Sequence, residues 1–373
     1  MGEIHLKTVY GQDPVSKQWL CPLRELWGLS SHERMSPVLE EKLCFTATQT
    51  GSYESAAQVA QKWGVEVDDS TIQWHVQQAG VRARAQCEER TDVALDPSTR
   101  GQVVERASVE IGRERFSLVL MLDGWMSRYR GEQWGLKPAD APGERVAWHE
   151  IKSGIVFRIE DQAKNQSNRG SLMRKYYVSM RGDAQAIGRR LHAEALRRGL
   201  AQARRVYVVA DGAVWIWNVV EDRFSHAIGV LDFYHASQQL WAVAKDLYGE
   251  TAQARIWVEP LLHQLRHGQG STVVEGLEQL LHKCRSEQHA STPVVATKLE
   301  YFNKHRERID YEKTSAQGCP CGSGAMESTC SQLQNRFKRT GQFWTQAGHS
   351  ALMELEIARR NGDWFDIWIP KAA

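Results

Sequence analysis

The hydrophobic pattern in the middle of the chain predicts a sheet built from short strands. The runs Phe116–Leu122 and Val206–Ala210 are continuous and rich in aliphatic side chains, as in strands that are buried on both faces. With the alternating stretches added, the pattern predicts strands over residues 116–123, 146–159, 175–181, 206–210 and 227–233. A helix over residues 183–198 precedes the fourth strand, so the order is β-β-β-α-β. This order predicts an α/β fold.

Helical periodicity follows the sheet. Apolar residues recur every three to four positions between residues 236 and 311, which predicts helices that pack on one another. Further helices are expected over residues 325–338 and 345–360. The polar, glycine-rich residues 127–144 predict a loop, and residues 83–114 predict a charged connector that is helical only near its end.

The N-terminal part predicts three helices, which start at Pro37, Ser52 and Ser70, and the third is expected to end at Gly80. The last two are short and are joined by a turn that contains Gly64, which is the outline of a helix-turn-helix. In that interpretation DNA is contacted by Thr71, Gln73, Trp74, Gln77, Arg82 and Arg84. An ordinary helical hairpin fits the same pattern.

Three acidic residues stand where an α/β fold could gather them. Asp123 and Asp211 each end an apolar run and precede a glycine, and Glu327 lies early in the helix that follows Gly322 and Ser323. An Asp-Gly pair after a strand is by itself a common turn signal. A helix start, however, has unpaired N–H groups that suit a carboxylate, and carboxylates brought together are the oxygen ligands that Mg²⁺ prefers. The three acids are therefore a candidate metal site.

These residues lie in sequence blocks that resemble a known family. Residues 123–125, 211–216, 231–235 and 322–328 are similar, in the same order, to the DDE transposases of bacterial insertion sequences, and in particular to the ISKra family. The resemblance extends from about Pro37 to the end of the chain. It implies an RNase H-like catalytic core with an all-α insertion before the last acid.

The resemblance also implies roles for individual residues. Asp123, Asp211 and Glu327 would be the catalytic acids and would bind two Mg²⁺ ions, for which Mn²⁺ can substitute. Asp232 and His235 match a supporting Asp-x-x-His motif of related transposases. Around Cys319-Pro-Cys321 the chain departs from the family, in which more apolar residues are usual.

The expected organisation has six segments. They are an N-terminal segment of unknown role (1–36), a helix-turn-helix-like DNA-binding domain (37–82), a connector (83–114), the first part of the core (115–235), the α-helical insertion (236–317) and the final core helices (318–373).

Composition narrows the class of protein only a little. A net charge of +2 does not indicate nucleic-acid binding, so any DNA surface must come from local clusters such as Arg336, Lys338 and Arg339. Seven scattered cysteines and the lack of a signal peptide predict reduced thiols in a cytoplasm. No apolar run reaches the roughly 20 residues of a membrane span.

The sequence and the resemblance together predict a DNA transposase of a bacterial insertion sequence, which acts near the nucleoid. Its partners would be double-stranded DNA, as element ends and target, and at least one further copy of the chain, because two ends are cut in one complex. A metal-dependent nuclease with the same core and a catalytically silent DNA-binding descendant are the alternatives.

Overall fold

The computed structural model describes residues 9–26, 35–112, 115–136, 143–164 and 170–369. The chain forms two compact units. The first unit comprises Met1–Glu89, Met126–His149 and Gln332–Ala373, and the second comprises Arg90–Trp125 and Glu150–Ser331.

The second unit is built on a five-stranded mixed sheet, in the order β7-β4-β3-β8-β9. The strands are β3 (Ser117–Arg130), β4 (Val146–Arg158), β7 (Tyr176–Met180), β8 (Arg205–Ala210) and β9 (Ile228–Leu231). Strands β3, β8 and β9 run parallel, whereas β4 and β7 pair antiparallel. The predicted α/β class and the five predicted strands are confirmed, and the first and fourth of them are neighbours, as expected.

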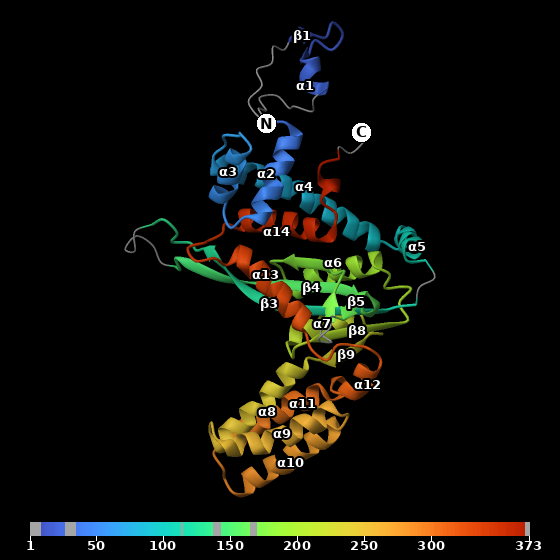
Figure 1. Cartoon of the computed structure of the whole chain (residues 1–373), viewed down its shortest axis with the longest axis vertical. Coiled ribbons are helices and arrows are strands. Elements are labelled where there is room, and N and C mark those ends of the chain that lie inside the picture. Colours follow the sequence, from blue (N-terminus) through green and yellow to red (C-terminus); the bar gives the residue numbers. More distant parts are fainter. Residues whose placement is uncertain (1–8, 27–34, 113–114, 137–142, 165–169, 370–373) are drawn as a thin grey trace. The chain divides into compact units, whose positions relative to one another are not determined.

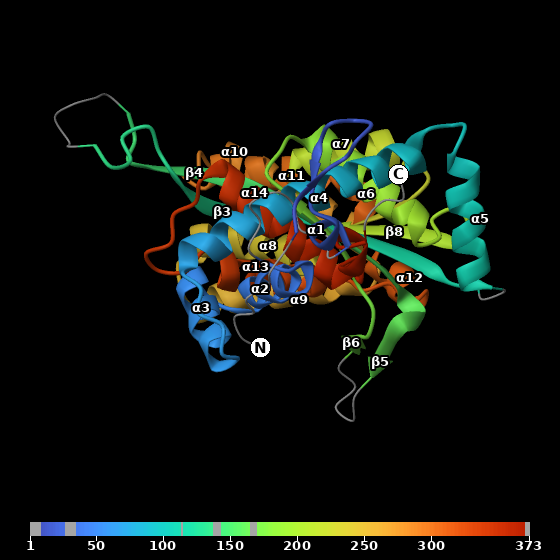
Figure 2. The same ribbon diagram turned by 90° about the horizontal axis from the view of Figure 1, so that it is seen from above.

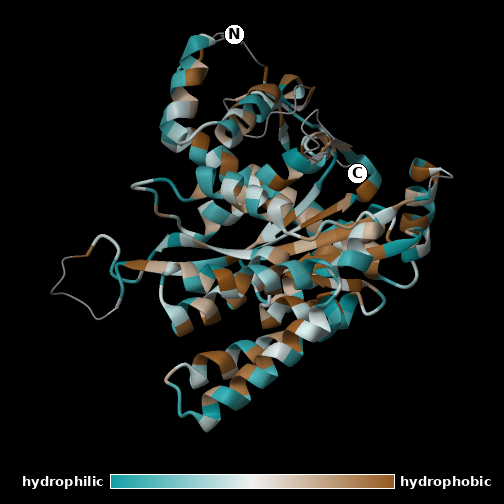
Figure 3. Ribbon diagram, turned by 60° about the horizontal axis from the view of Figure 1, so that its bottom comes forward, coloured by the Kyte–Doolittle hydropathy of each residue, from teal (hydrophilic) through white to brown (hydrophobic). Residues whose placement is uncertain are grey.

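Side-chain alternation gives the two faces of the sheet different environments. Leu118, Leu120 and Leu122 of β3 belong to a buried cluster with helices α5 (Arg100–Ile111), α6 (Ala184–Arg197) and α7 (Val214–Arg223), of which Figure 1 shows α6 and α7 beside the sheet. Because successive side chains alternate, Val119, Met121 and Asp123 point to the opposite face. Figure 3 shows the apolar character of these strands as brown ribbon.

Strand β3 is longer than the sequence predicts. The expected loop over residues 127–144 is wrong at its start, because β3 continues to Arg130. Ser127 and Tyr129 alternate as buried residues with exposed neighbours, and Tyr129 forms an isolated parallel bridge with Trp344 in the first unit. The polar residues of this stretch made a strand with one buried face look like a loop in the sequence. Asp123 therefore lies within a strand and not at its end.

The helices predicted after the sheet, in the segment expected as a helical insertion, are confirmed as a set of mutually packed helices. They are α8 (Phe233–Tyr248), α9 (Ala252–Arg266), α10 (Gly270–Ser286) and α11 (Thr292–Lys304), drawn in yellow and orange in Figure 1. Helix α8 starts three residues before the expected boundary at residue 236. The short helix α12 (Tyr311–Ala316) ends this segment, and helix α13 (Gly324–Phe337) follows it.

The first unit contains helices from both ends of the chain. They are α2 (Pro37–Gln49), α3 (Tyr53–Lys62), the start of α4 (Asp69–Leu95) and α14 (Gln346–Asn361). Ser36 caps α2 and Pro37 occupies its first turn, as predicted. Figures 1 and 2 both show α4 and α14 side by side. The described chain also contains α1 (Pro22–Leu26) and two small hairpins, β1–β2 (Gly11–Gln12, Trp19–Leu20) and β5–β6 (Gln162–Lys164, Gly170–Leu172).

Helix α4 corrects two expectations. The third helix does not end at Gly80 but runs for 27 residues, so much of the expected connector belongs to it. Its start is also different, because α4 begins at Asp69 and not at Ser70, and the Asp68 carboxylate before it accepts the Thr71 N–H at 2.8 Å. A glycine inside a helix costs only about 1 kcal/mol, which packing can offset. The long helix departs from the outline of two short helices.

A buried carboxylate joins α2 to α4. Glu40 is 8% exposed, and its Oε1 lies 3.3 Å from His75 Nδ1 and 3.0 Å from Arg82 Nη2. Burial alone would raise the pKa of Glu40, but the hydrogen bonds from His75 and Arg82 lower it below its ordinary value. A carboxyl with a lowered folded-state pKa stabilises the protein above its unfolded pKa, and this stabilisation is lost as the pH falls through the folded pKa.

Glu40→Gln is therefore expected to lower the free energy of unfolding by about 1–3 kcal/mol at pH 7, because the charged acceptor of two hydrogen bonds is lost. Urea unfolding of wild type and variant should show a smaller difference at about pH 3 than at pH 7. The matched change Glu66→Gln, at an exposed glutamate between α3 and α4, should be silent at both values. An equal loss at both pH values would contradict the ionic role of Glu40.

Candidate functional site

Two of the predicted acids lie on neighbouring parallel strands. Met121 pairs with Val209 across β3 and β8, and two residues further along the chain stand Asp123, within β3, and Asp211, directly after the end of β8. Both carboxylates accept a local N–H, from Gly124 at 2.7 Å and from Ala213 at 2.9 Å. Burial first, and then the negative charge of Asp211, raises the pKa of Asp123. Two half-buried carboxylates that disfavour each other's charge are suited to a cation.

A third carboxylate, Asp232, links the start of the helical insertion to its end. Its Oδ1 accepts the His235 N–H at 2.8 Å and caps α8, and its Oδ2 accepts the N–H of Ser323, just before α13. The Phe233 N–H also donates to the Cys321 carbonyl at 2.9 Å. Burial would raise the pKa of Asp232, but the hydrogen bonds from His235 and Ser323 hold it well below its usual range. Asp232 thus fixes where α13 begins.

Glu327 lies in the first turn of α13, as predicted, and is exposed. The Ser323 hydroxyl donates to its Oε1 at 3.5 Å, and the Glu327 N–H donates to the Ser323 carbonyl at 3.0 Å. Because Ser323 is itself bound by Asp232, the position of Glu327 depends on that buried carboxylate. The N-terminal end of α13 carries a partial positive charge, so a carboxylate is favourably placed there.

His235 stands between these groups. Its Nδ1 lies 3.3 Å from Asp232 Oδ1, and about a third of the side chain is exposed. The contact with Asp232, with further contributions from the charges of Asp211 and Glu327, raises the pKa of His235. One ligand atom each from Asp232, His235 and Glu327 lie within 4.8 Å of one another, close enough to surround one metal ion. His235 was expected at a strand end, but it lies in the first turn of α8.

The structure therefore brings all five predicted residues into one neighbourhood of the second unit. The charge of His235 acts to lower the pKa of Asp123, and the charges of Asp211 and Glu327 act to raise the pKa of His235. Carboxylate oxygens and one imidazole are donors that divalent cations accept, so the residues present fit a metal centre. We refer to Asp123, Asp211, Asp232, His235 and Glu327 as the acidic cluster.

Two residues beside the acidic cluster were not singled out from sequence. The buried thiol of Cys330 forms a hydrogen bond with the Asp123 carboxylate, and burial followed by the Asp123 charge raises the pKa of that thiol. The helical spacing that places Cys330 on the same face as Glu327 was the available signal. Tyr301 of α11 packs on Gly212, where an added Cβ would lie 2.3 Å from its ring. No local pattern indicates that contact, because it joins residues that are far apart in the sequence.

The predicted DNA contacts on α4 have different environments. Trp74 is 56% exposed and Arg84 is exposed, whereas Gln73 and Gln77 are half-buried. The Thr71 hydroxyl donates to Asp68 at 3.2 Å. Arg82 contacts Glu40 and places its guanidinium 5.1 Å from the centre of the Trp368 ring.

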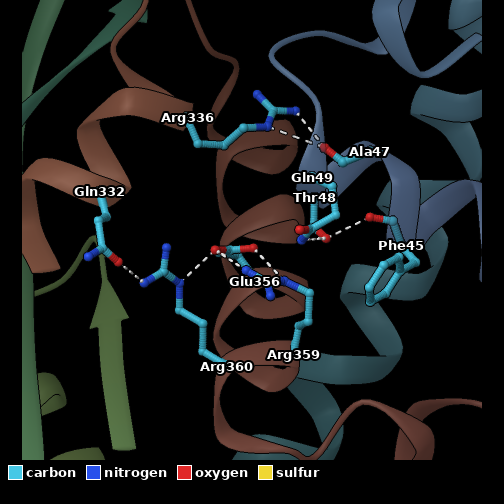
Figure 4. A network of polar contacts seen from close by, with 9 residues as sticks. All are labelled: Phe45, Ala47, Thr48, Gln49, Gln332, Arg336, Glu356, Arg359 and Arg360. Carbon is cyan, nitrogen blue, oxygen red and sulfur yellow. Dashed lines mark hydrogen bonds and ion pairs between the residues drawn. The ribbon is translucent and has the colours of Figure 1, made fainter. Parts of the chain in front are cut away.

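Arg336, one of the predicted DNA contacts, has a structural role in the first unit. It is buried, and its guanidinium donates to the Ala47 carbonyl at 3.0 Å and to the Gly51 carbonyl at 3.4 Å, as Figure 4 shows in part. These carbonyls lie at the end of α2 and just after it, so Arg336 acts there as a structural cap. The DNA contact of Arg336 stays a prediction, and most of this side chain is already engaged within the first unit. Lys338 is half-buried and Arg339 is exposed.

The geometry defines a mixed α/β protein with a candidate divalent-metal centre at one sheet face. A family model described as an uncharacterised protein family, UPF0236, matches residues 154–367, which is more than half of the chain. The chain therefore belongs to UPF0236. None of the curated proteins matches the chain significantly. No helix within the described ranges is long and apolar enough to cross a membrane.

Proposed function

We propose that this protein is a metal-dependent DNA transposase with an RNase H-like core, similar to the ISKra family. The observation that carries the proposal is the position of Asp123 and Asp211, on adjacent parallel strands, next to Glu327 of a later helix. In order of appearance the sheet reads 3-2-1-4-5, with the helical insertion placed before the last acid. This arrangement supports the core that the sequence resemblance implies.

The acidic cluster supplies what phosphodiester chemistry needs from the protein. Asp123 and Asp211 present oxygens on one sheet face, and Glu327 adds a carboxylate from α13. Divalent ions held there would activate a water or a DNA 3′-hydroxyl and stabilise the leaving oxygen of an in-line displacement. Hydrolysis at an element end and strand transfer into target DNA would use this site in succession. Two ends in one complex require at least two copies of the chain.

The test is a cleavage and joining assay with the DNA segments that flank the gene. Purified protein with Mg²⁺ or Mn²⁺ should nick those ends and join them to a target duplex, and should be inactive in EDTA. Cutting without preference for the ends would instead indicate a nuclease. Specific binding without cutting, with either metal, would indicate a silent DNA-binding descendant.

An aromatic and basic surface in the first unit supports DNA as the partner. Lys338 places its Nζ 5.3 Å from the centre of the Trp148 ring, and Trp148 is 49% exposed. The Arg128 guanidinium lies 5.9 Å from the same ring. Exposed aromatic rings beside cations are typical of surfaces on which bases stack and phosphates bind.

The double variant Lys338→Ala/Arg339→Ala is expected to weaken binding of DNA ends about tenfold at 100 mM salt. Without these two cations the protein neutralises fewer phosphates, so binding releases fewer counterions from the DNA. The plot of log affinity against log salt should also become shallower by about 1 to 2. Fluorescence anisotropy at several salt concentrations measures both quantities. The matched pair Lys298→Ala/Arg306→Ala, in and near α11, should leave both unchanged. Unchanged affinity and slope in the Lys338/Arg339 variant would exclude these residues from the DNA surface.

A further inference from the structure

The ring of His235 is held between a buried carboxylate and the exposed part of the acidic cluster. Its Nδ1 faces Asp232 at 3.3 Å, and the Asp232 side chain is 1% exposed. The two nitrogens of an imidazole lie on opposite sides of the ring, so Nε2 is left for another partner. The charges that act on His235, apart from that of Asp232, come first from Asp211 and Glu327.

We propose that His235 is a direct ligand of a divalent cation through Nε2, together with Glu327, and that Asp232 positions the ring. This inference rests on the proposed function in using the same acidic cluster, but it adds a nitrogen donor to the three acids. One possible ligand atom each of His235, Glu327 and Asp232 lie within 4.8 Å of one another, so an ion bound by the first two would lie beside the third.

Asp232 is a positioning residue and not a ligand in this arrangement. Its two oxygens already accept the backbone N–H groups of His235 and Ser323. A metal bond to either oxygen would compete with the hydrogen bond that caps α8 or with the hydrogen bond to Ser323 before α13. Metal-binding histidines commonly donate their second ring N–H to a carboxylate, which fixes the tautomer and makes the free nitrogen a better ligand. Asp232 Oδ1 lies 3.3 Å from His235 Nδ1, within ion-pair distance, and so stands where such a carboxylate would stand.

A nitrogen ligand changes which cation the site prefers. Mg²⁺ binds oxygen donors almost exclusively, whereas imidazole suits Mn²⁺ better and Zn²⁺ better still. The acidic cluster with His235 should therefore bind Mn²⁺ more tightly than Mg²⁺, and by a larger factor than three carboxylates would give. The loss of His235 should reduce that factor without removing the carboxylate site.

The experiment measures Mn²⁺ binding to the full chain, without DNA, by electron paramagnetic resonance, and Mg²⁺ binding by competition. In pulsed electron paramagnetic resonance, the Mn²⁺ echo of the wild type should show the modulation that a directly bound nitrogen produces. His235→Ala should lose that signal, weaken Mn²⁺ binding about 10- to 100-fold and weaken Mg²⁺ binding less than about threefold. The matched change His226→Ala, at an exposed histidine before β9, should keep the wild-type signal and both affinities.

Two further variants separate ligation from folding. Asp232→Asn should keep the nitrogen signal but weaken Mn²⁺ binding about tenfold, because the ring loses its fixed orientation. His235→Gln, which offers a side-chain oxygen of similar reach, should lose the nitrogen signal while its circular dichroism stays that of wild type.

The nitrogen signal and the DNA assay can fail separately. A protein that binds Mn²⁺ through His235 but never cuts DNA would overturn the proposed function and leave this inference standing. A protein that cuts DNA with Mn²⁺ but gives no nitrogen signal, or one whose signal survives His235→Ala, would overturn the inference alone. If wild type binds neither cation, both are overturned.

Discussion

Asp211→Asn is expected to bind DNA ends as wild type does, yet to lose metal-dependent strand cleavage by about a thousandfold or more. The amide has nearly the same shape as the carboxylate, and its oxygen can still accept the Ala213 N–H that Asp211 accepts at 2.9 Å. The local backbone is therefore retained while one negative charge is lost. That charge is the part of Asp211 that a cation on the acidic cluster needs.

The measurement is the initial rate of nicking with Mn²⁺ and with Mg²⁺, alongside DNA affinity for the same preparations. Asp222→Asn is the matched control, because Asp222 is an exposed acid of α7 that pairs with the neighbouring Arg223. It should retain the wild-type rate. An Asp211→Asn enzyme that cuts at more than half the wild-type rate would remove Asp211 from the catalytic residues.

Gly80→Val is expected to lower the free energy of unfolding by about 3 kcal/mol. Gly80 lies inside α4, where an added Cβ would stand 2.4 Å from both the Cα and the Cβ of Ala351 in α14. The nearest atoms include backbone, so they cannot move aside as a flexible side chain would. The two helices must separate, and both supply buried side chains to the first unit.

Urea denaturation with the change in tryptophan fluorescence measures this loss. Gly276→Val is the matched control, because Gly276 also lies inside a helix, α10, and an added Cβ there meets nothing within 4 Å. Gly276→Val should cost less than about 1 kcal/mol. An equal loss of stability in the two variants would show that Gly80 is not needed for the close approach of α4 and α14.

The sheet could be predicted from the sequence because each strand is recognisable from the pattern of its own residues. Continuous runs such as Val206–Ala210 are typical of strands covered on both sides, and the structure buries every residue of that run. The connection through α6 then makes the first and fourth strands neighbours. The positions of Asp123 and Asp211 follow from that strand order, and so the two acids could be paired from the sequence alone.

The failures have a common cause in contacts between distant residues. Ser127 and Tyr129 look like loop residues until Trp344 supplies a partner strand position. Gly80 looks like a helix end until Ala351 explains why a side chain is excluded there. Arg336 looks like a surface cation until the end of α2 supplies the carbonyls that bind it. These contacts cannot be predicted from local propensity, because their partners lie far away in the sequence.

The five residues of the acidic cluster could be predicted from the sequence, but the hydrogen bonds that Asp232 makes within and beside it could not. The spacing of Asp232 and His235 was noticed as a motif, yet the capping of α8 by Asp232 depends on a helix that begins at Phe233. The sequence pattern extended the preceding strand through Phe233, because aromatic and branched residues favour strands there. The hydrogen bond to Ser323 spans 91 residues and could not be inferred from any window of sequence.

That hydrogen bond has a consequence for how the chain can change during evolution. The helices α8–α11 leave the core at Asp232, and the chain returns to the same carboxylate at Ser323. Segments whose two ends lie together can be lengthened, shortened or exchanged at little cost to the scaffold that carries them. The helical insertion is therefore a module, and related chains are free to vary it in size while Glu327 keeps its place.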